Sequence, residues 1–209
     1  MLNTLQEVPY TISSPNKAET AEKFDDFADR AVILLKPLAA TNETLTRMIL
    51  DRLAPFVDIE SWRLVESTDP NTVRDHYRDA EGKKYFPTIT TYMTGKPTYA
   101  LAVRSKGVLE RALAKQKAGE KLGLRPDMGF QDCIRTLLIG PSSPAEAKPN
   151  QIRGLANKFG LKTTQYLGED VLSDDQLVGG WRNCEDNLIH CSDSPQSAWS
   201  EYQVWFGNI

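Results

Sequence analysis

The sequence predicts an α+β protein in which strands and helices alternate. Residues 31–35, Ala-Val-Ile-Leu-Leu, form an unbroken apolar run that is typical of a strand buried on both faces. Residues 42–53 place apolar side chains at helical spacing behind Asn42, which is a good helix N-cap. Residues 195–206 show the same spacing near the end of the chain. A buried strand, a capped helix and a closing helix indicate a mixed fold.

The segments between these elements continue the alternation. Asp69-Pro70 is a good helix start, because a cap residue precedes a proline at the first helical position. The other expected elements are strands at 57–65, 98–103 and 188–190 and a helix after Gly107. We expect residues 1–29 to be an N-terminal extension and residues 30–209 to form the domain.

The composition is that of an ordinary globular protein. The 209 residues are 40% hydrophobic and 25% charged, and the net charge of −3 gives no general attraction to nucleic acid or to anionic lipid. The first residues lack the pattern of a signal peptide, and no stretch is long enough to span a membrane. Three cysteines without metal-ligand spacing fit free thiols in a reducing compartment. We therefore expect a cytoplasmic protein.

The segment from Asn187 to Ser194, Asn-Leu-Ile-His-Cys-Ser-Asp-Ser, carries the strongest candidate for chemistry. His190 is one of only two histidines, and it ends a short strand just before the helix at Pro195. Free backbone N–H groups at a helix N-terminus suit a phosphate held against a nucleophile. The alternative is a strand-end histidine that hydrogen-bonds to a neighbouring carbonyl. Both interpretations stay open on these residues alone.

The pattern N-x-x-H-x-S-D-S resembles the active-site signature of nucleoside diphosphate kinases, in which the histidine takes up a phosphoryl group. Four other segments resemble motifs of that family in the same order. They are Lys36-Pro37, His76-Tyr77 to Phe86, the turn at Thr91 to Pro97, and the loop from Pro144 to Gly154. The resemblance implies a ferredoxin-like α+β sandwich with a four-stranded antiparallel sheet covered by helices. It also implies insertions at about 107–132 and 156–185.

The resemblance assigns roles residue by residue. It implies that His190 is the nucleophile, that Glu201 orients it, and that Ser192 and Lys36 complete the catalytic group. The residues that it implies for nucleotide binding are Lys36, Tyr77, Tyr85, Ile89, Arg135, Ser142, Arg153 and Asn187. Among them, Tyr85 would stack on the base beside Ile89, and the two arginines would bind phosphate through their planar forks. Mg²⁺ would be held mainly by the nucleotide phosphates, without protein ligands.

The implied activity is transfer of the γ-phosphoryl group of a nucleoside triphosphate to a nucleoside diphosphate. The implied assembly is a homo-oligomer, and the insertions favour a dimer or tetramer. Several residues depart from the family pattern: Leu38 replaces an aspartate, Asn42 lies near the place of an arginine, Lys83-Lys84 replaces an Arg-Pro pair, and Cys191 replaces a glycine. A nucleotide-binding regulatory relative with little or no kinase activity is therefore the alternative. An interaction module that uses the fold as a scaffold would leave the retained site residues unexplained.

Cys191 follows the nucleophile directly. A thiol next to a helix N-terminus and two arginines is expected to favour the thiolate and so to be open to oxidation. A left-handed backbone at this position would also favour the family's glycine over any side chain. The alternative is a small buried thiol that fills space.

Overall fold

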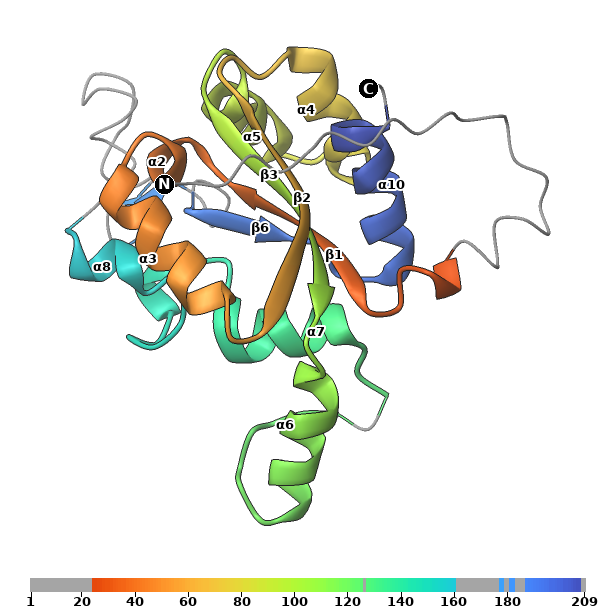
Figure 1. Ribbon diagram of the computed structural model, residues 1–209. Coiled ribbons are helices and arrows are strands. Elements are labelled where there is room, and N and C mark those ends of the chain that lie inside the picture. Colours follow the sequence, from red (N-terminus) through yellow and green to blue (C-terminus); the bar gives the residue numbers. More distant parts are fainter. Residues whose placement is uncertain (1–23, 126, 161–176, 179–180, 183–186, 208–209) are drawn as a thin grey trace.

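A four-stranded antiparallel sheet forms the centre of the molecule. The computed structural model describes residues 24–125, 127–160, 177–178, 181–182 and 187–207. The strands are β1 (Arg30–Leu35), β2 (Val57–Val65), β3 (Thr98–Ser105) and β6 (Ile189–Cys191), and they lie in the order β2-β3-β1-β6 (Figure 1). All three pairings are antiparallel. The predicted ferredoxin-like α+β fold is confirmed.

β1 lies inside the sheet, between β3 and β6, as its apolar composition predicts. Every residue from Ala31 to Leu35 is buried, as expected for an apolar run with a strand on each side. Its register puts Leu34 opposite His190 of β6. The central strand therefore leads to the same edge of the sheet as the candidate nucleophile.

Helices cover the sheet and connect its strands (Figure 1). They are α2 (Pro37–Ala40), α3 (Glu43–Leu53), α4 (Pro70–His76), α5 (Phe86–Met93), α6 (Val108–Lys117), α7 (Phe130–Ile134), α8 (Leu155–Lys158) and α10 (Pro195–Phe206). Two short strands, β4 (Leu177–Val178) and β5 (Trp181–Arg182), form a separate antiparallel pair. Arg135–Ile139 continues α7 as a π-helical turn.

The predicted helix caps are confirmed. The Asn42 side chain accepts a hydrogen bond from the N–H of Leu45 at 3.0 Å, and Asp69 accepts one from Asn71 at 2.7 Å. α5 is a difference from the prediction, because the expected turn at Thr91–Pro97 begins only after this helix ends at Met93. Ile89, Tyr92 and Met93 are buried on one side of α5, and their burial keeps these residues helical.

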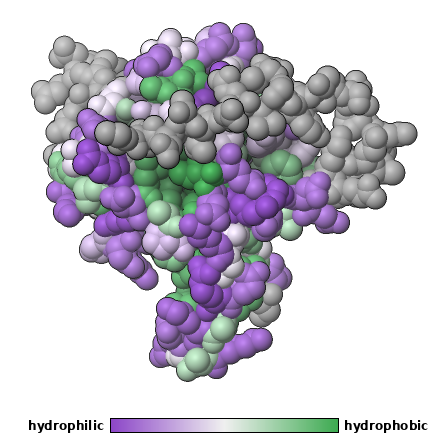
Figure 2. Space-filling view, viewed as in Figure 1, coloured by the Kyte–Doolittle hydropathy of each residue, from purple (hydrophilic) through white to green (hydrophobic). Residues whose placement is uncertain are grey.

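α6 and the segment that follows it form an arm, residues 107–125, which projects away from the sheet (Figure 1). The arm lies within the insertion predicted at about 107–132. Leucines of the arm pack with Ala112, Met128 and Cys133 in a small hydrophobic cluster apart from the main core. The arm surface is largely hydrophilic (Figure 2).

The predicted N-terminal extension is described only from Phe24 onward. Phe24 packs edge-to-face on Trp199 with ring centroids 5.9 Å apart, and Phe27 packs on Tyr202 at 5.6 Å, so this end of the extension lies against α10. Residues 1–23 and most of the insertion predicted at 156–185 lie outside the described residues. Within the part of the chain that is described, none of the helices has the length and apolar character needed to traverse a lipid bilayer.

Candidate active site

His190, Glu201 and Ser192 form one hydrogen-bonded group. His190 Nε2 lies 2.9 Å from Glu201 Oε1, and the Ser192 hydroxyl donates to Glu201 Oε2 at 2.7 Å. β6 presents His190 and is followed at once by Ser192, while α10 presents Glu201. Ser194 caps α10 in a capping box with Ser197, so the helix starts at a fixed point after β6. The structure thus brings together three of the four predicted catalytic residues.

The geometry fixes which nitrogen of His190 is reactive. Burial, with the positive charges of Lys36, Arg153 and Arg135, holds the pKa of His190 well below 6.5, so the imidazole is neutral at physiological pH. A neutral imidazole has one N–H, and an ionised Glu201 can only accept a hydrogen bond, so the carboxylate 2.9 Å away places this N–H on Nε2. Nδ1 therefore keeps its lone pair, as a nucleophile requires.

Glu201 is a buried carboxyl group with a perturbed pKa. Its side chain is 8% exposed, and burial raises its pKa to about 7, although the electrostatic interaction with His76 and the hydrogen bond from Ser192 act in the opposite direction. The group that orients His190 therefore titrates near physiological pH.

Lys36 lies beside this group. It follows the last residue of β1, is 1% exposed, and its Nζ lies 5.6 Å from the centroid of the Tyr77 ring. The Tyr77 ring is in turn 5.8 Å from the His190 ring. Lys36 and Tyr77, which come from different segments of the sequence, therefore lie in one neighbourhood with the nucleophile.

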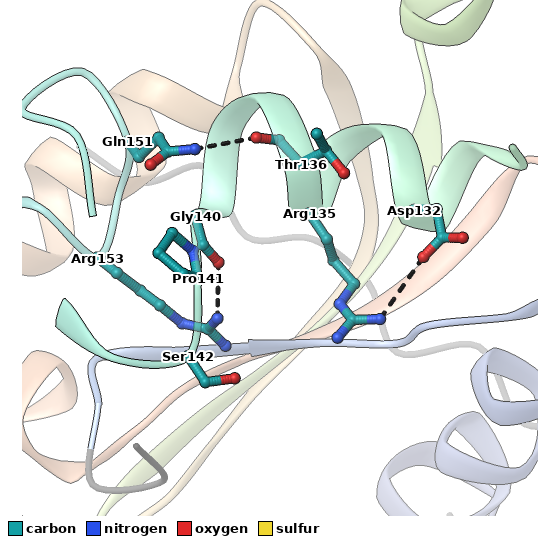
Figure 3. A pocket seen from close by; sticks show the side chains of 8 residues that line it. All are labelled: Asp132, Arg135, Thr136, Gly140, Pro141, Ser142, Gln151 and Arg153. Carbon is teal, nitrogen blue, oxygen red and sulfur yellow. Dashed lines mark hydrogen bonds and ion pairs between the residues drawn. The ribbon is translucent and has the colours of Figure 1, made fainter. Parts of the chain in front are cut away.

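Arg135 and Arg153 line an open hollow of about 400 Å³ next to β6 (Figure 3). The hollow is lined by Asp132, Arg135, Thr136, Gly140, Pro141, Ser142, Gln151 and Arg153. Arg153 donates from Nη1 to the carbonyl of Gly140 at 2.8 Å and from Nη2 to that of Ile189 at 2.9 Å. Two guanidinium groups on one hollow form a site suited to phosphate oxygens.

Ser142 and Asn187 are joined directly. The amide of Asn187 donates to the carbonyl of Ser142 at 3.1 Å, and its oxygen accepts from the N–H of Ile189 at 3.2 Å. Asn187 therefore ties the arginine-lined hollow to the strand of His190.

Comparisons with known proteins find nucleoside diphosphate kinases among the similar sequences. No protein family model matches the chain. A nucleoside diphosphate kinase of Streptomyces avermitilis is 26% identical over 183 residues, which cover 86% of this chain and 96% of the relative. A nucleoside diphosphate kinase of Roseiflexus sp. is 27% identical over 179 residues, which cover 85% of this chain and 87% of that relative. The chain is a divergent member of the nucleoside diphosphate kinase family.

Solved structures of nucleoside diphosphate kinases share the fold. The enzyme of Encephalitozoon cuniculi superposes with a TM-score of 0.54 at 19% identity, covering 86% of this chain and 90% of that one. The Aquifex aeolicus protein gives a TM-score of 0.54 at 22% identity, covering 86% and 96%. The family recognised in the motifs and the predicted fold are thus both confirmed.

Tyr85 and Ile89, the predicted base contacts, lie at α5 and are not part of the hydrogen-bonded group around His190. Tyr85 is half-buried just before the helix. Ile89 is 1% exposed and belongs to the main hydrophobic core. Its side chain offers almost no surface to a base in this conformation, so Tyr85 is the better placed of the two.

His76 is a member of the site that received no role from the sequence. Its ring lies 4.5 Å from the His190 ring, and its Nδ1 accepts a hydrogen bond from the Trp205 indole N–H at 3.0 Å. Burial lowers the pKa of His76 to about 3, so the ring is neutral and its proton sits on Nε2. Nε2 is buried and has no hydrogen-bond partner among the described residues.

A metal ion finds no ready site in this cluster. Ligand-type atoms of His76, His190 and Glu201 lie within 4.8 Å of one another. A metal would need a lone pair on each imidazole, but the Trp205 N–H occupies the Nδ1 lone pair of His76 and leaves a proton on Nε2. In this arrangement His76 is a hydrogen-bond donor towards the site and not a metal ligand.

Two further residues position the site and gave no sequence signal. The fully buried Tyr92 hydroxyl accepts from the N–H of Leu38 at 3.3 Å and donates to the carbonyl of Asn187 at 3.2 Å. Arg52 of α3 donates to the carbonyls of Gln151 and Pro149 at 2.8 and 3.3 Å, next to Arg153. Both side chains hold backbone segments that are remote in sequence, which no local pattern reveals.

The expectation of a reactive Cys191 is wrong. The residue is 3% exposed, and burial together with Glu201 raises the pKa of its thiol to about 12, which outweighs the two arginines. It lies in β6 opposite Ile33, so its backbone is extended and glycine has no left-handed advantage here. Cys191 is a small buried thiol that fills space.

The backbone amides expected at the N-terminus of α10 are also engaged within the protein. Asp193 and Ser194 donate their N–H groups to the hydroxyl of Ser197, and Ser197 donates its own to Ser194. Because these three amides are satisfied, a phosphate near His190 would meet positive charge mainly from the lysine and arginine side chains.

We expect thiol chemistry to reflect this burial. With Cys184 replaced by alanine, the native protein should react slowly with a maleimide, and Cys191 no faster than Cys133, whose pKa burial raises to about 11. Mass spectrometry after timed labelling measures each site, and labelling in denaturant gives the maximum. Rapid labelling of Cys191 alone would show that its thiolate is accessible.

Proposed function

We propose that the chain transfers the γ-phosphoryl group of a nucleoside triphosphate to a nucleoside diphosphate through a phosphohistidine on Nδ1 of His190. One observation carries the proposal: Nε2 of His190 lies 2.9 Å from Glu201 Oε1, so an ionised Glu201 accepts Nε2–H from the neutral imidazole and leaves the lone pair on Nδ1. The family of the chain supports the same reaction, since its relatives are named nucleoside diphosphate kinases.

In the first half-reaction the Nδ1 lone pair attacks the γ-phosphorus. The new P–N bond forms as the bond to the β–γ bridging oxygen breaks, and the nucleoside diphosphate leaves with that electron pair. Positive charge develops on the imidazole, and the Glu201 carboxylate stabilises it through Nε2–H. Ser192 keeps the carboxylate in place. The second nucleoside diphosphate reverses these steps.

The charged side chains around His190 supply position and electrostatic stabilisation. Lys36, Arg135 and Arg153 are the cations whose fields act on His190, and they suit the charge that spreads over the phosphoryl oxygens. In the proposed complex Asn187 and Lys36 also hold the ribose hydroxyls, while Tyr77 and Tyr85 border the nucleoside. A stacking contact without base-edge hydrogen bonds would favour broad base tolerance.

Mg²⁺ belongs to the proposal as an ion that arrives with the nucleotide. Mg²⁺ usually keeps several waters and uses substrate phosphates with one or two carboxylates, so the site residues fit an ion without a dedicated cage. Glu201 is already engaged by His190 and Ser192. Bound to the phosphates, the ion would neutralise part of their charge. An oligomer of dimer or tetramer size and a cytoplasmic location remain predictions.

Labelling tests the proposal directly. With γ-labelled ATP and Mg²⁺ the protein should take up one label in an acid-labile, base-stable bond, as a P–N bond to imidazole requires. His190→Asn should abolish the label. His76→Asn, which changes the only other histidine of the chain, should retain it. Label that persists in His190→Asn would overturn the assignment.

The second candidate is a nucleotide-binding protein with little or no turnover. It is favoured by Arg153, whose Nε, Nη1 and Nη2 all donate to the carbonyls of Gly140 and Ile189 and so act partly as structural groups. This candidate predicts ATP binding by the wild-type protein without transferable label. The same experiment therefore separates the two.

A further inference from the structure

The carboxylate of Asp132 is shared by two arginines at the edge of the arginine-lined hollow. Asp132 Oδ1 lies 3.7 Å from Nη1 of Arg135, and Asp132 Oδ2 lies 3.1 Å from Nη2 of Arg125. Figure 3 shows the Arg135 guanidinium turned towards Asp132, with both side chains lining the hollow. Arg135 belongs to the candidate site, whereas Arg125 belongs to the arm.

The arm holds Arg125 at a defined place. The Gln116 side chain donates to the carbonyl of Leu124 and accepts from its N–H, both at 2.8 Å, so it closes the arm next to Arg125. Leu124 is buried in the small cluster with Met128 and Cys133, which joins the arm to α7. The geometry between Arg125 and α7 is thus set by packing and not by the ion pair alone.

Asp132 competes with any anion for Arg135. A phosphate that approaches Arg135 meets a carboxylate of the same charge, and the guanidinium that would bind the phosphate already faces Asp132. Arg125 reduces this competition because it draws the same carboxylate to itself at a shorter distance. The three side chains are between one third and two thirds exposed, so the energies are small but still measurable.

We propose that Asp132 is a positioning residue that sets the phosphate affinity of the site through Arg135, and that Arg125 of the arm adjusts it. This inference rests on the proposed function and adds a regulatory input to the same site. Without Arg125, Asp132 is left to hold Arg135, and phosphate binding weakens. With Arg125 on Asp132, Arg135 is freer to bind the nucleotide.

A double-mutant cycle on ADP binding tests the coupling. Asp132→Asn should lower the Kd for ADP by about two- to fivefold, and Arg125→Gln should raise it by a similar factor. In the Asp132→Asn protein, Arg125→Gln should have no further effect, because the carboxylate through which it acts is gone. Glu120→Gln, which removes an exposed negative charge from the same arm, measures the direct long-range effect of charge.

Each result decides the proposal. Calorimetry at two salt concentrations gives the Kd values, and both single effects should shrink at the higher salt. If Arg125→Gln weakens ADP equally with and without Asp132, or if Asp132→Asn does not tighten ADP, the coupling is wrong while the proposed function stands. If the wild-type protein binds no ADP, the proposed function falls. In that case the same double-mutant cycle is measured with inorganic pyrophosphate to test the coupling. If the protein does not bind pyrophosphate either, the coupling is overturned as well.

Discussion

Glu201→Gln is expected to slow phosphorylation of His190 by on the order of 100-fold. Glutamine can still accept the Nε2–H of His190 and meet Ser192, but it carries no negative charge to stabilise the imidazolium that forms as the P–N bond is made. It can also present its amide N–H to Nε2, which would place the imidazole proton on Nδ1 and remove the nucleophile. Rapid-quench measurement of label on His190 gives the rate.

The same carboxyl group should govern the pH dependence. Burial raises the pKa of Glu201 to about 7. Below that pH the protonated carboxyl donates to Nε2 and leaves the imidazole proton on Nδ1, so the rate should fall as the pH drops through about 7. The pKa of His190 itself is held well below 6.5, so its own protonation does not produce this limb.

Two variants test whether Glu201 is the group that titrates near pH 7. Glu201→Gln should lose the acid limb near pH 7, because the titrating group is absent. Ser192→Ala should keep the limb but shift it to higher pH, because the hydrogen bond from Ser192 holds the pKa of Glu201 down. A Glu201→Gln protein with wild-type rate and an unchanged limb would show that another group titrates there.

The part of the fold that the sequence predicted follows from local signals. The apolar run of β1 is buried along its whole length after Arg30, and Asn42 and Asp69 cap the helices that follow them. α5 escaped prediction because Pro87 and three threonines weaken its helical signal, while burial of Tyr92 and Met93 stabilises it. Tertiary packing, and not local propensity, therefore makes this segment helical.

The candidate site likewise contains residues that the sequence predicted and residues that it did not. The sequence predicted His190, Glu201 and Ser192 through a motif and a helical spacing, and the structure joins them by hydrogen bonds. The environment of Cys191 could not be foreseen, because its pKa depends on burial under elements far away in the chain. Asp132 was also missed, since a single aspartate in a short helix shows nothing of the arginines that it faces.

Gly154→Ala should be the most damaging small substitution in the loop from Pro144 to Gly154. A Cβ at this position would collide with the backbone carbonyl of Lys148 and lie 3.2 Å from that of Gln151. The backbone cannot move aside without displacing Arg153, whose guanidinium bridges the carbonyls of Gly140 and Ile189. We expect a loss of about 1–3 kcal/mol in the free energy of unfolding and, because a misplaced phosphate ligand misorients the reacting groups, a loss of turnover on the order of 100-fold.

Gly129→Ala is the matched control, because the same methyl group is added where it meets no backbone atom. Gly129 has a φ of −80°, which any residue adopts, and its added Cβ would meet only the end of the Gln131 side chain at 3.3 Å. Chemical denaturation and steady-state kinetics of both variants should therefore separate steric displacement of the loop from the general effect of replacing a glycine. If Gly154→Ala keeps wild-type stability and turnover, the loop relaxes without moving Arg153, and Arg153 does not need its present position for phosphate binding.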